Sequence, residues 1–144
     1  MAKYQKPDAL TTRLINPLIA MLTKLGLSVR GSHVLAVRGR KTGKMQEVPV
    51  NPVEVGGVRY LIAPRGDTQW VRNLRAAGEA ELRVGQRREH IHAREIENTG
   101  KPPVLRAYLR RWKRETGKFF GVDDQASDED LARIAPDHPV FQIT

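Results

Sequence analysis

The 144-residue sequence contains no cysteine. This absence excludes disulfide bonds, thiolate metal sites and cysteine nucleophiles. Long apolar runs are also missing: no stretch of 18 or more apolar residues occurs, so no membrane-spanning helix is expected. The first residues lack the charged-then-apolar order and small-residue cleavage site of a signal peptide. These absences predict a cytoplasmic protein.

Motifs of hydrolytic enzymes are absent as well. The sequence has no Gly-x-Ser-x-Gly or His-Glu-x-x-His pattern and no obvious pair of catalytic carboxylates. His90 and His92 would share one face of a strand, but no third metal ligand lies nearby in the sequence. A solvated sheet face therefore explains them better than a metal site, and no metal is expected.

Positive charge is what the chain has in excess. Lysine and arginine total 25 against 16 aspartate and glutamate residues, which gives a net charge of +9. Such a surplus favours an anionic partner without identifying it. Nucleic acid, an anionic membrane face and a phosphorylated cofactor all remain candidates.

The length of 144 residues predicts a single domain over residues 1–144. An amphipathic helix within residues 1–28 is interrupted by Pro17, and its apolar face would pack on the core or touch a membrane. Alternating patterns then predict strands, at 33–37, 46–50, 53–55, 58–63, 80–84, 89–97 and 140–143. Pro49 and Pro52 indicate an edge strand or a bulge. Mostly antiparallel strands with helices between hairpins favour a small barrel or curled sheet.

Three helices are predicted among the strands. The first is capped by Asp67 and ends near Gly78, the second begins at Pro102 and Pro103, and the third covers 128–135. The second would bury one apolar face, made of Val104, Leu105, Tyr108, Leu109 and Trp112. Its opposite face is basic, with Arg106, Arg110, Arg111, Lys113 and Arg114. That face keeps a nucleic-acid-binding module as an alternative function.

The run Gly39-Arg40-Lys41-Thr42-Gly43 is the strongest local signal. Glycines at both ends of a basic pair let the backbone bend and approach a ligand closely. Backbone N–H groups in such a turn form a concavity that suits an anion. A P-loop is excluded because a strand, not a helix, follows the turn. The expected ligand carries phosphate or carboxylate groups.

The order of these motifs resembles the deazaflavin-dependent nitroreductase family. The resemblance rests on Gly39 to Gly43, then on Val48-Pro49-Val50, on Leu61 to Asp67 and on Trp70-Val71-Arg72-Asn73-Leu74, and ends at His138-Pro139-Val140-Phe141. It implies an α+β fold, a split β-barrel of mostly antiparallel strands (FMN-binding split-barrel-like) with flanking helices. Residues 30–98 would form the barrel core with an inserted helix at 67–78, and residues 101–144 would supply helices and the last strand.

The resemblance also implies a cofactor, coenzyme F-420, an 8-hydroxy-5-deazaflavin with a phosphate and an oligoglutamate tail. Arg40, Lys41, Thr42 and Gly43 would contact the phosphate and tail, and Pro49 joins the cofactor-binding candidates. Ala63, Pro64, Arg65, Gly66 and Asp67 would lie beside the ribityl chain and ring. Asn73 and Arg75 would anchor that wall or reach the tail. FMN is the rival cofactor, and the extended basic turn favours the more anionic deazaflavin.

The implied activity is hydride transfer from the reduced deazaflavin to an electron-poor acceptor, such as an enone, a quinone or a nitroaromatic compound. Solvent or a tyrosine would supply the proton, with Tyr108 as the candidate. Phe119 and Phe120 are candidates for the acceptor pocket. A non-enzymatic carrier of the deazaflavin or of a lipid-like molecule at a membrane is the remaining alternative. Either a monomer or a homodimer is expected.

Overall fold

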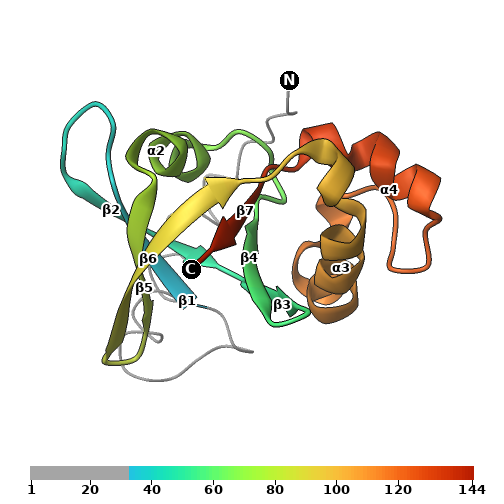
Figure 1. Ribbon diagram of the computed structural model, residues 1–144, viewed down its shortest axis with the longest axis horizontal. Helices are drawn as coiled ribbons and strands as arrows, with labels where there is room; N and C mark the ends of the chain where they lie inside the picture. Colours follow the sequence, from blue (N-terminus) through green and yellow to red (C-terminus); the bar gives the residue numbers. More distant parts are fainter. Residues whose placement is uncertain (1–32) are drawn as a thin grey trace.

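A computed structural model describes residues 33–144, which form one curled antiparallel sheet with helices on its sides (Figure 1). The sheet of this described part has seven strands in the order β2-β1-β5-β6-β7-β4-β3. Their bounds are β1 His33–Arg38, β2 Met45–Val50, β3 Val53–Val55, β4 Val58–Ile62, β5 Glu79–Val84, β6 Arg87–Glu95 and β7 Val140–Ile143. The helices are α2 Gln69–Ala77, α3 Pro102–Thr116 and α4 Asp128–Ile134, and short 3-10 turns precede α3 and follow α3 and α4.

Strand β6 gives the sheet its curl because it pairs with two partners along its length. Its first part, from Arg87 to His92, pairs with β5, and its end, from Ala93 to Glu95, pairs with β7. One half of the sheet therefore contains β2, β1 and β5, and the other contains β7, β4 and β3. This arrangement is the curled antiparallel sheet predicted from the sequence.

The prediction that Pro49 lies in an edge strand is confirmed. It stands opposite Val34 in β2, and β2 forms one edge of the sheet. An edge position tolerates a residue that cannot donate to the ladder. The central neighbour β1 is buried on both faces, since Val34 to Val37 are all inaccessible to solvent.

Helix α2 packs Val71 and Leu74 into the sheet, while Trp70 lies at the margin of the same cluster. Its predicted cap was wrong by one residue. Thr68 occupies the N-cap position, and its side chain makes no capping hydrogen bond. Asp67 lies one residue before the N-cap, and its carboxylate accepts a hydrogen bond from Arg75. The helix ends at Gly78, whose left-handed backbone (φ 73°) lets its N–H donate to the Leu74 carbonyl at 2.8 Å.

Helix α3 buries the apolar face predicted for it and forms a second cluster with α4 and Phe120. Residues on β4 and β7 alternate between the two clusters. Leu61 and Phe141 face the cluster under α2, whereas Ile62 and Val140 face the cluster under α3. Successive strand residues point to opposite faces, so two neighbouring strands serve both cores.

The helix predicted within residues 1–28 lies outside the described residues. Within residues 33–144, none of the helices combines the length and the apolar character needed to cross a bilayer.

Candidate functional site

The connection between β1 and β2 is a tight turn closed by its own backbone. The Gly39 N–H donates to the Lys44 carbonyl at 2.8 Å, and the Gly43 N–H donates to the Gly39 carbonyl at 2.9 Å. Gly43 has a left-handed backbone (φ 73°) that favours glycine. A Cβ atom at Gly39 would lie 3.0 Å from Thr42 Oγ1 and 3.2 Å from the Lys44 carbonyl. Crowding therefore favours glycine at position 39, and the left-handed backbone favours glycine at position 43.

A buried asparagine fixes this turn on helix α2. Asn73 is only 5% exposed, and its Oδ1 accepts bonds from the Arg40 backbone N–H at 3.1 Å and from Arg40 Nη1 at 2.8 Å. Arg40 Nη1 also donates to Gln69 Oε1 at 2.9 Å. The sequence motif thus acquires a rigid support from a residue 33 positions later. The supporting role of Gln69 was not predicted, because only the fold brings it to the turn.

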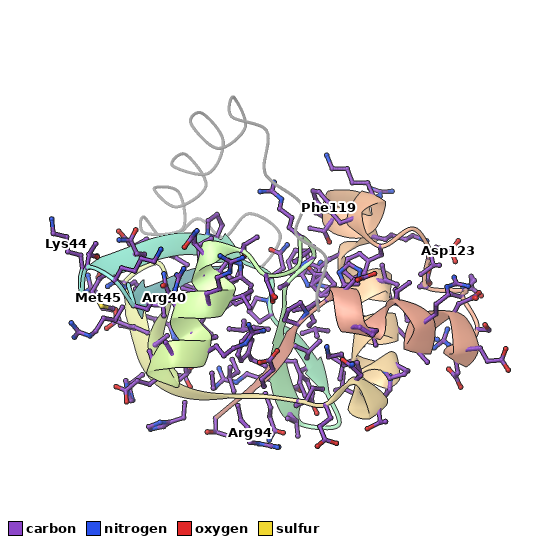
Figure 2. All side chains as sticks on the ribbon, turned by 90° about the horizontal axis from the view of Figure 1, so that it is seen from above. Arg40, Lys44, Met45, Arg94, Phe119 and Asp123 are labelled. Carbon is purple, nitrogen blue, oxygen red and sulfur yellow. The ribbon has the colours of Figure 1, made fainter. Side chains whose placement is uncertain are left out.

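The turn presents positive charge and free donors to solvent. Lys41 and Lys44 are exposed, and Arg38 and Arg40 lie at its base. In Figure 2 Lys44 extends away from the hairpin, while Arg40 lies beside α2. Within residues 33–144, the N–H groups of Lys41 and Thr42 donate to no protein acceptor. Two unpaired amides beside several cations form a site suited to an anion.

The segment from Ala63 to Asp67 connects β4 to the start of α2. Its backbone is held by the Ala63 N–H, which donates to the Pro139 carbonyl at 2.9 Å. Gly66 adopts a left-handed conformation (φ 84°), and its N–H donates back to the Ala63 carbonyl at 3.3 Å. The segment and the Gly39–Lys44 turn therefore flank the same helix, one continuous with its N-terminus and one attached through Asn73.

Arg75 stabilises the wall formed by this segment. Its Nε lies 2.7 Å from Glu95 Oε1, and its Nη2 lies 3.2 Å from Asp67 Oδ1. The hydrogen bonds that Arg75 donates to the Glu95 carboxylate raise the pKa of Arg75 above its ordinary value, and Asp67 adds to the effect. The sequence predicted that Arg75 anchors this wall or reaches the cofactor tail. In this geometry the guanidinium points to the Glu95 and Asp67 carboxylates and not to the Gly39–Lys44 turn, as an anchor would.

Tyr108 lies in the second core rather than in the site. Its side chain is 1% exposed, and its hydroxyl is 3.3 Å from Thr116 Oγ1. Burial raises the pKa of Tyr108 to about 12, so the phenol stays protonated at neutral pH. Its ring packs against Phe120 with centroids 5.6 Å apart. The structure therefore separates this candidate proton donor from solvent.

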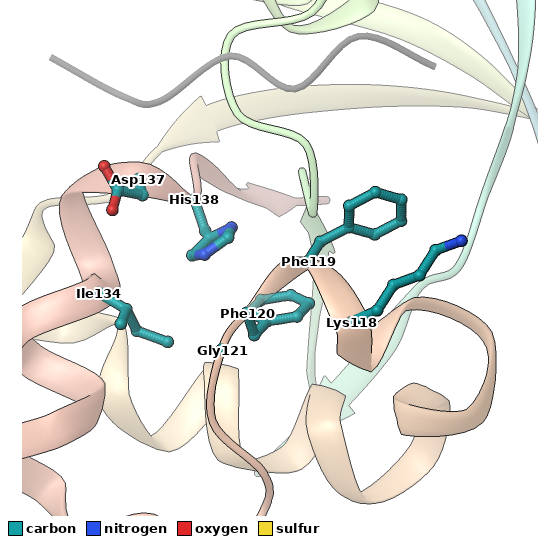
Figure 3. A pocket seen from close by; sticks show the side chains of 7 residues that line it. All are labelled: Lys118, Phe119, Phe120, Gly121, Ile134, Asp137 and His138. Carbon is teal, nitrogen blue, oxygen red and sulfur yellow. The ribbon is translucent and has the colours of Figure 1, made fainter. Parts of the chain in front are cut away.

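Phe119 and Phe120 border a pocket of about 200 Å³ (Figure 3). The other lining residues are Lys118, Gly121, Ile134, Asp137 and His138. Phe120 is buried and stacks on the His138 ring at a centroid distance of 4.3 Å. The Arg65 guanidinium lies 5.2 Å from the centre of the Phe119 ring. The pocket therefore adjoins the segment from Ala63 to Asp67.

A metal site at His90 and His92 and a nucleic-acid-binding face on α3 were the alternatives raised by the sequence. His90 and His92 are exposed, and His90 Nε2 lies 3.1 Å from Glu79 Oε1. No cluster of three metal-ligating side chains occurs within residues 33–144. On the basic face of α3, Arg106 pairs with Asp128 at 2.8 Å and Lys113 pairs with Asp124 at 3.2 Å. Local acidic groups thus neutralise part of that face.

Comparison with solved structures identifies the fold. The structure of an F420-H2 dependent reductase (FDR-A) aligns with a TM-score of 0.57 at 19% identity, over 80% of this chain and 95% of that one. A protein described as a domain-swapped dimer aligns with a TM-score of 0.58 at 19% identity, over 89% of this chain and 92% of that one. The protein Atu2129 from Agrobacterium tumefaciens, of unknown function, aligns with a TM-score of 0.56 at 15% identity, over 96% of this chain and 60% of that one. These likenesses confirm the predicted α+β split-barrel fold. Among curated proteins, none matches the sequence significantly.

Comparison with protein families identifies the cofactor. The family described as F420H2-dependent quinone reductase matches residues 19–125. This range contains the Gly39–Lys44 turn, the Ala63 to Asp67 segment, all of α2 and both phenylalanines of the pocket. The chain belongs to the F420H2-dependent quinone reductase family and is a coenzyme F-420-dependent reductase.

Proposed function

We propose that this reductase transfers a hydride from reduced coenzyme F-420 to a small electron-poor acceptor, such as a quinone, an enone or a nitroaromatic compound. The observation that carries the proposal is the turn from Gly39 to Lys44. It combines two unpaired amides with clustered cations and is held rigid by Asn73. A phosphate and an oligoglutamate tail need such a site because charge-assisted hydrogen bonds recognise both groups.

The residues of this chain fit the cofactor in separate regions. Arg40, Lys41, Thr42 and Gly43 would hold the phosphate and tail, since the Lys41 and Thr42 amides have no protein acceptor in the described part. The segment from Ala63 to Asp67 would lie along the ribityl chain and ring. Arg75 would keep that wall in place through its bonds to Glu95 and Asp67. When bound, the reduced deazaflavin supplies a hydride from a ring carbon rather than single electrons.

The chain contributes orientation and exclusion of water rather than a covalent step. The Phe119 ring touches the Arg65 end of the wall, so an acceptor near the cofactor ring would meet an aromatic surface. We assign the proton to solvent, because Tyr108 is enclosed and its hydroxyl is occupied by Thr116. This role for Phe119 and Phe120 makes the pocket the substrate side of the site.

The test is a fluorescence titration of the protein with oxidised coenzyme F-420 and with FMN at low and high salt. We expect tight binding of the deazaflavin, weakening with salt, and weak binding of FMN. The variant Lys41→Ala should weaken deazaflavin binding about tenfold, because it removes a charge beside the tail. Lys113→Ala is the matched control, since it removes one lysine charge from α3, where Lys113 pairs with Asp124.

Equal weakening in both lysine variants would contradict the assignment of the tail to the turn, because only net charge would then matter. Absence of deazaflavin binding to the unaltered protein would contradict the whole proposal. If binding occurs, the reduced cofactor is mixed with one member of each acceptor class, and its reoxidation is followed by absorbance. The class with the highest kcat/KM identifies the acceptor.

The assembly state is a separate part of the proposal. We propose a monomer or a homodimer, and the homodimer gains support from the similar structure described as a domain-swapped dimer. Light scattering after size-exclusion chromatography distinguishes the two states by mass. A peripheral membrane contact through residues 1–28 also stays a proposal, and co-sedimentation with anionic vesicles tests it directly.

A further inference from the structure

His138 is a buried histidine at the junction between the pocket and the wall formed by residues Ala63 to Asp67. Its side chain is 2% exposed and lines the pocket. The residue follows the 3-10 turn Ala135–Asp137, and in Figure 3 its imidazole lies between this turn and the Phe120 ring. The two rings stack with an interplanar angle of 29°. The imidazole is therefore held in place on the pocket side.

On its other side the imidazole is hydrogen-bonded to the wall. Burial lowers the pKa of His138, and hydrogen bonds to the Ala63 and Pro64 carbonyls oppose this effect. A neutral imidazole has one N–H and one lone pair. Because Nδ1 has no hydrogen-bond partner, the N–H that meets the two carbonyls belongs to Nε2. The main chain ties the same segments together, since the Ala63 N–H donates to the Pro139 carbonyl at 2.9 Å.

The backbone that carries the histidine is itself fixed to the start of α3. Two donors converge on the Ala135 carbonyl, the His138 backbone N–H at 3.2 Å and Lys101 Nζ at 2.9 Å. Lys101 is 4% exposed and immediately precedes α3. Its charge lowers the pKa of His138, whereas Asp137 raises it. The surroundings thus present a neutral imidazole to the wall from a rigid base.

The wall is held at both of its ends. His138 holds the carbonyls of its first two residues, and Arg75 holds its last residue through Asp67 at 3.2 Å. Without the Nε2–H, a carbonyl that accepts from it would lose a partner, and an unmade hydrogen bond in the interior is costly. The wall would then move to regain a partner. A displacement of about 1 Å of a group that orients the reactants is enough to slow a reaction severely.

We propose that His138 is a positioning residue for hydride transfer, and that its Nε2–H fixes the wall against which the deazaflavin ring lies. The inference rests on the proposed function. The imidazole takes no part in the bond changes: the hydride passes from the reduced cofactor to the acceptor, and the proton comes from solvent. Because the phosphate and tail bind at the Gly39–Lys44 turn, loss of this contact should slow the transfer more than it weakens cofactor binding.

Two variants separate the hydrogen bond from the packing of the ring. His138→Phe keeps a ring against Phe120 and removes both nitrogens, whereas His138→Gln places an amide N–H near the position of Nε2. Reduced coenzyme F-420 is mixed with menadione, and its reoxidation is followed in a single turnover. We expect His138→Phe to slow this step about tenfold and to leave the Kd for the cofactor within about twofold. His138→Gln should recover most of the rate.

His92→Phe is the matched control, since it makes the same change at an exposed position on β6, and should alter neither quantity. An unchanged rate in His138→Phe would overturn the inference. So would equal losses in His138→Phe and His138→Gln, because the N–H would then be irrelevant.

Nuclear magnetic resonance of the free protein tests the contact without cofactor or turnover. In the unaltered protein we expect the His138 ring proton on Nε2, and a proton on Nδ1 would overturn the inference however the variants fold. In His138→Phe the Ala63 amide should exchange with solvent about tenfold faster, while the amides of β1 keep their rates. Unchanged exchange at Ala63 would also contradict the inference. Failure of the unaltered protein to bind coenzyme F-420 would instead contradict the proposed function, and the free-protein measurements would still decide whether His138 holds the wall.

Discussion

Three polar side chains in the described part of the chain are buried, and each is held by hydrogen bonds to another segment. Asn73 accepts two bonds from Arg40 and so shapes the turn. Lys101 donates from Nζ to the Ala135 carbonyl at 2.9 Å and joins the start of α3 to the turn before β7. His138 leaves Nδ1 unpaired. All three side chains thus tie segments of the chain together, and His138 does so through the Ala63 and Pro64 carbonyls.

Tyr108 provides a prediction that separates a structural phenol from a proton donor. Its pKa is raised to about 12 by burial, against about 10 when the chain is unfolded. Above pH 10 the unfolded state loses this proton first, so the unfolded state is favoured as pH rises toward 12. We expect the free energy of unfolding to fall by about 2 kcal/mol across this range. Tyr108→Phe should remove that alkaline loss and keep kcat at pH 7.

Urea denaturation between pH 7 and 11.5 measures the alkaline loss of stability, and quinone reduction at pH 7 measures kcat. Tyr60→Phe, at a half-exposed tyrosine on β4, is the control and should leave the alkaline loss in place. A large fall in kcat for Tyr108→Phe, with unfolding behaviour unchanged, would restore the tyrosine as proton donor.

Individual residues of the site differ in how far the sequence could predict them. The turn from Gly39 to Gly43 was predictable because glycine spacing and charge act locally. Asn73 was predictable only through the family resemblance, and Gln69 was not predicted at all. His138 was named only within the last motif of the resemblance, since no neighbouring residue in the sequence signals its stacking on Phe120. Contacts across long sequence separations leave no local pattern.

At the scale of elements, the turn from Gly39 to Lys44 and helix α2 act as one unit. We expect Gly39→Ala to weaken binding of coenzyme F-420 by about tenfold or more, because the added Cβ would lie 3.0 Å from Thr42 Oγ1 and 3.2 Å from a backbone carbonyl. Either the turn or its hydrogen bonds must then move, at a cost of about 1–3 kcal/mol in stability. Cofactor titration and thermal unfolding measure the two effects.

Gly100→Ala is the matched control for this substitution. A Cβ at Gly100 would meet only Ile96 Cδ1 at 3.8 Å, an ordinary contact. This variant should bind the cofactor and unfold like the unaltered protein. Comparable binding losses in both variants, or unaltered binding in Gly39→Ala, would show that the close packing of the turn is not needed for the tail.

The helices and strands themselves were largely predictable from periodicity. The spacing of apolar residues in α3 predicted its buried face because that face repeats with the helical period. Boundaries were less certain where tertiary contacts decide them. Asp67 lies one residue before the N-cap of α2, where Arg75 holds its carboxylate, and β6 ends at Glu95 rather than at residue 97. Pairing of β6 with two partners is a property of the sheet that its own residues do not encode.

At the scale of the whole molecule, the two hydrophobic clusters share β4 and β7. Leu61 and Phe141 belong to the cluster under α2, and their neighbours Ile62 and Val140 belong to the cluster under α3. Opening either cluster would therefore expose one face of both strands. The Gly39–Lys44 turn is attached to the helix over one cluster, and the pocket bordered by Phe119 and Phe120 adjoins the other, so the shared strands hold the turn and the pocket in a fixed relation.

The two tryptophans test this coupling, since one reports on each cluster. Trp70 packs at the margin of the cluster under α2, and Trp112 is buried in the cluster under α3. We expect the single-tryptophan variants Trp70→Phe and Trp112→Phe each to unfold in one transition. In each variant, tryptophan fluorescence and far-ultraviolet circular dichroism should give the same midpoint in urea, because a cooperative domain loses both cores together. A fluorescence midpoint that departs from the dichroism midpoint in either variant would mean that the clusters unfold separately and that residues 33–144 do not form a single cooperative domain.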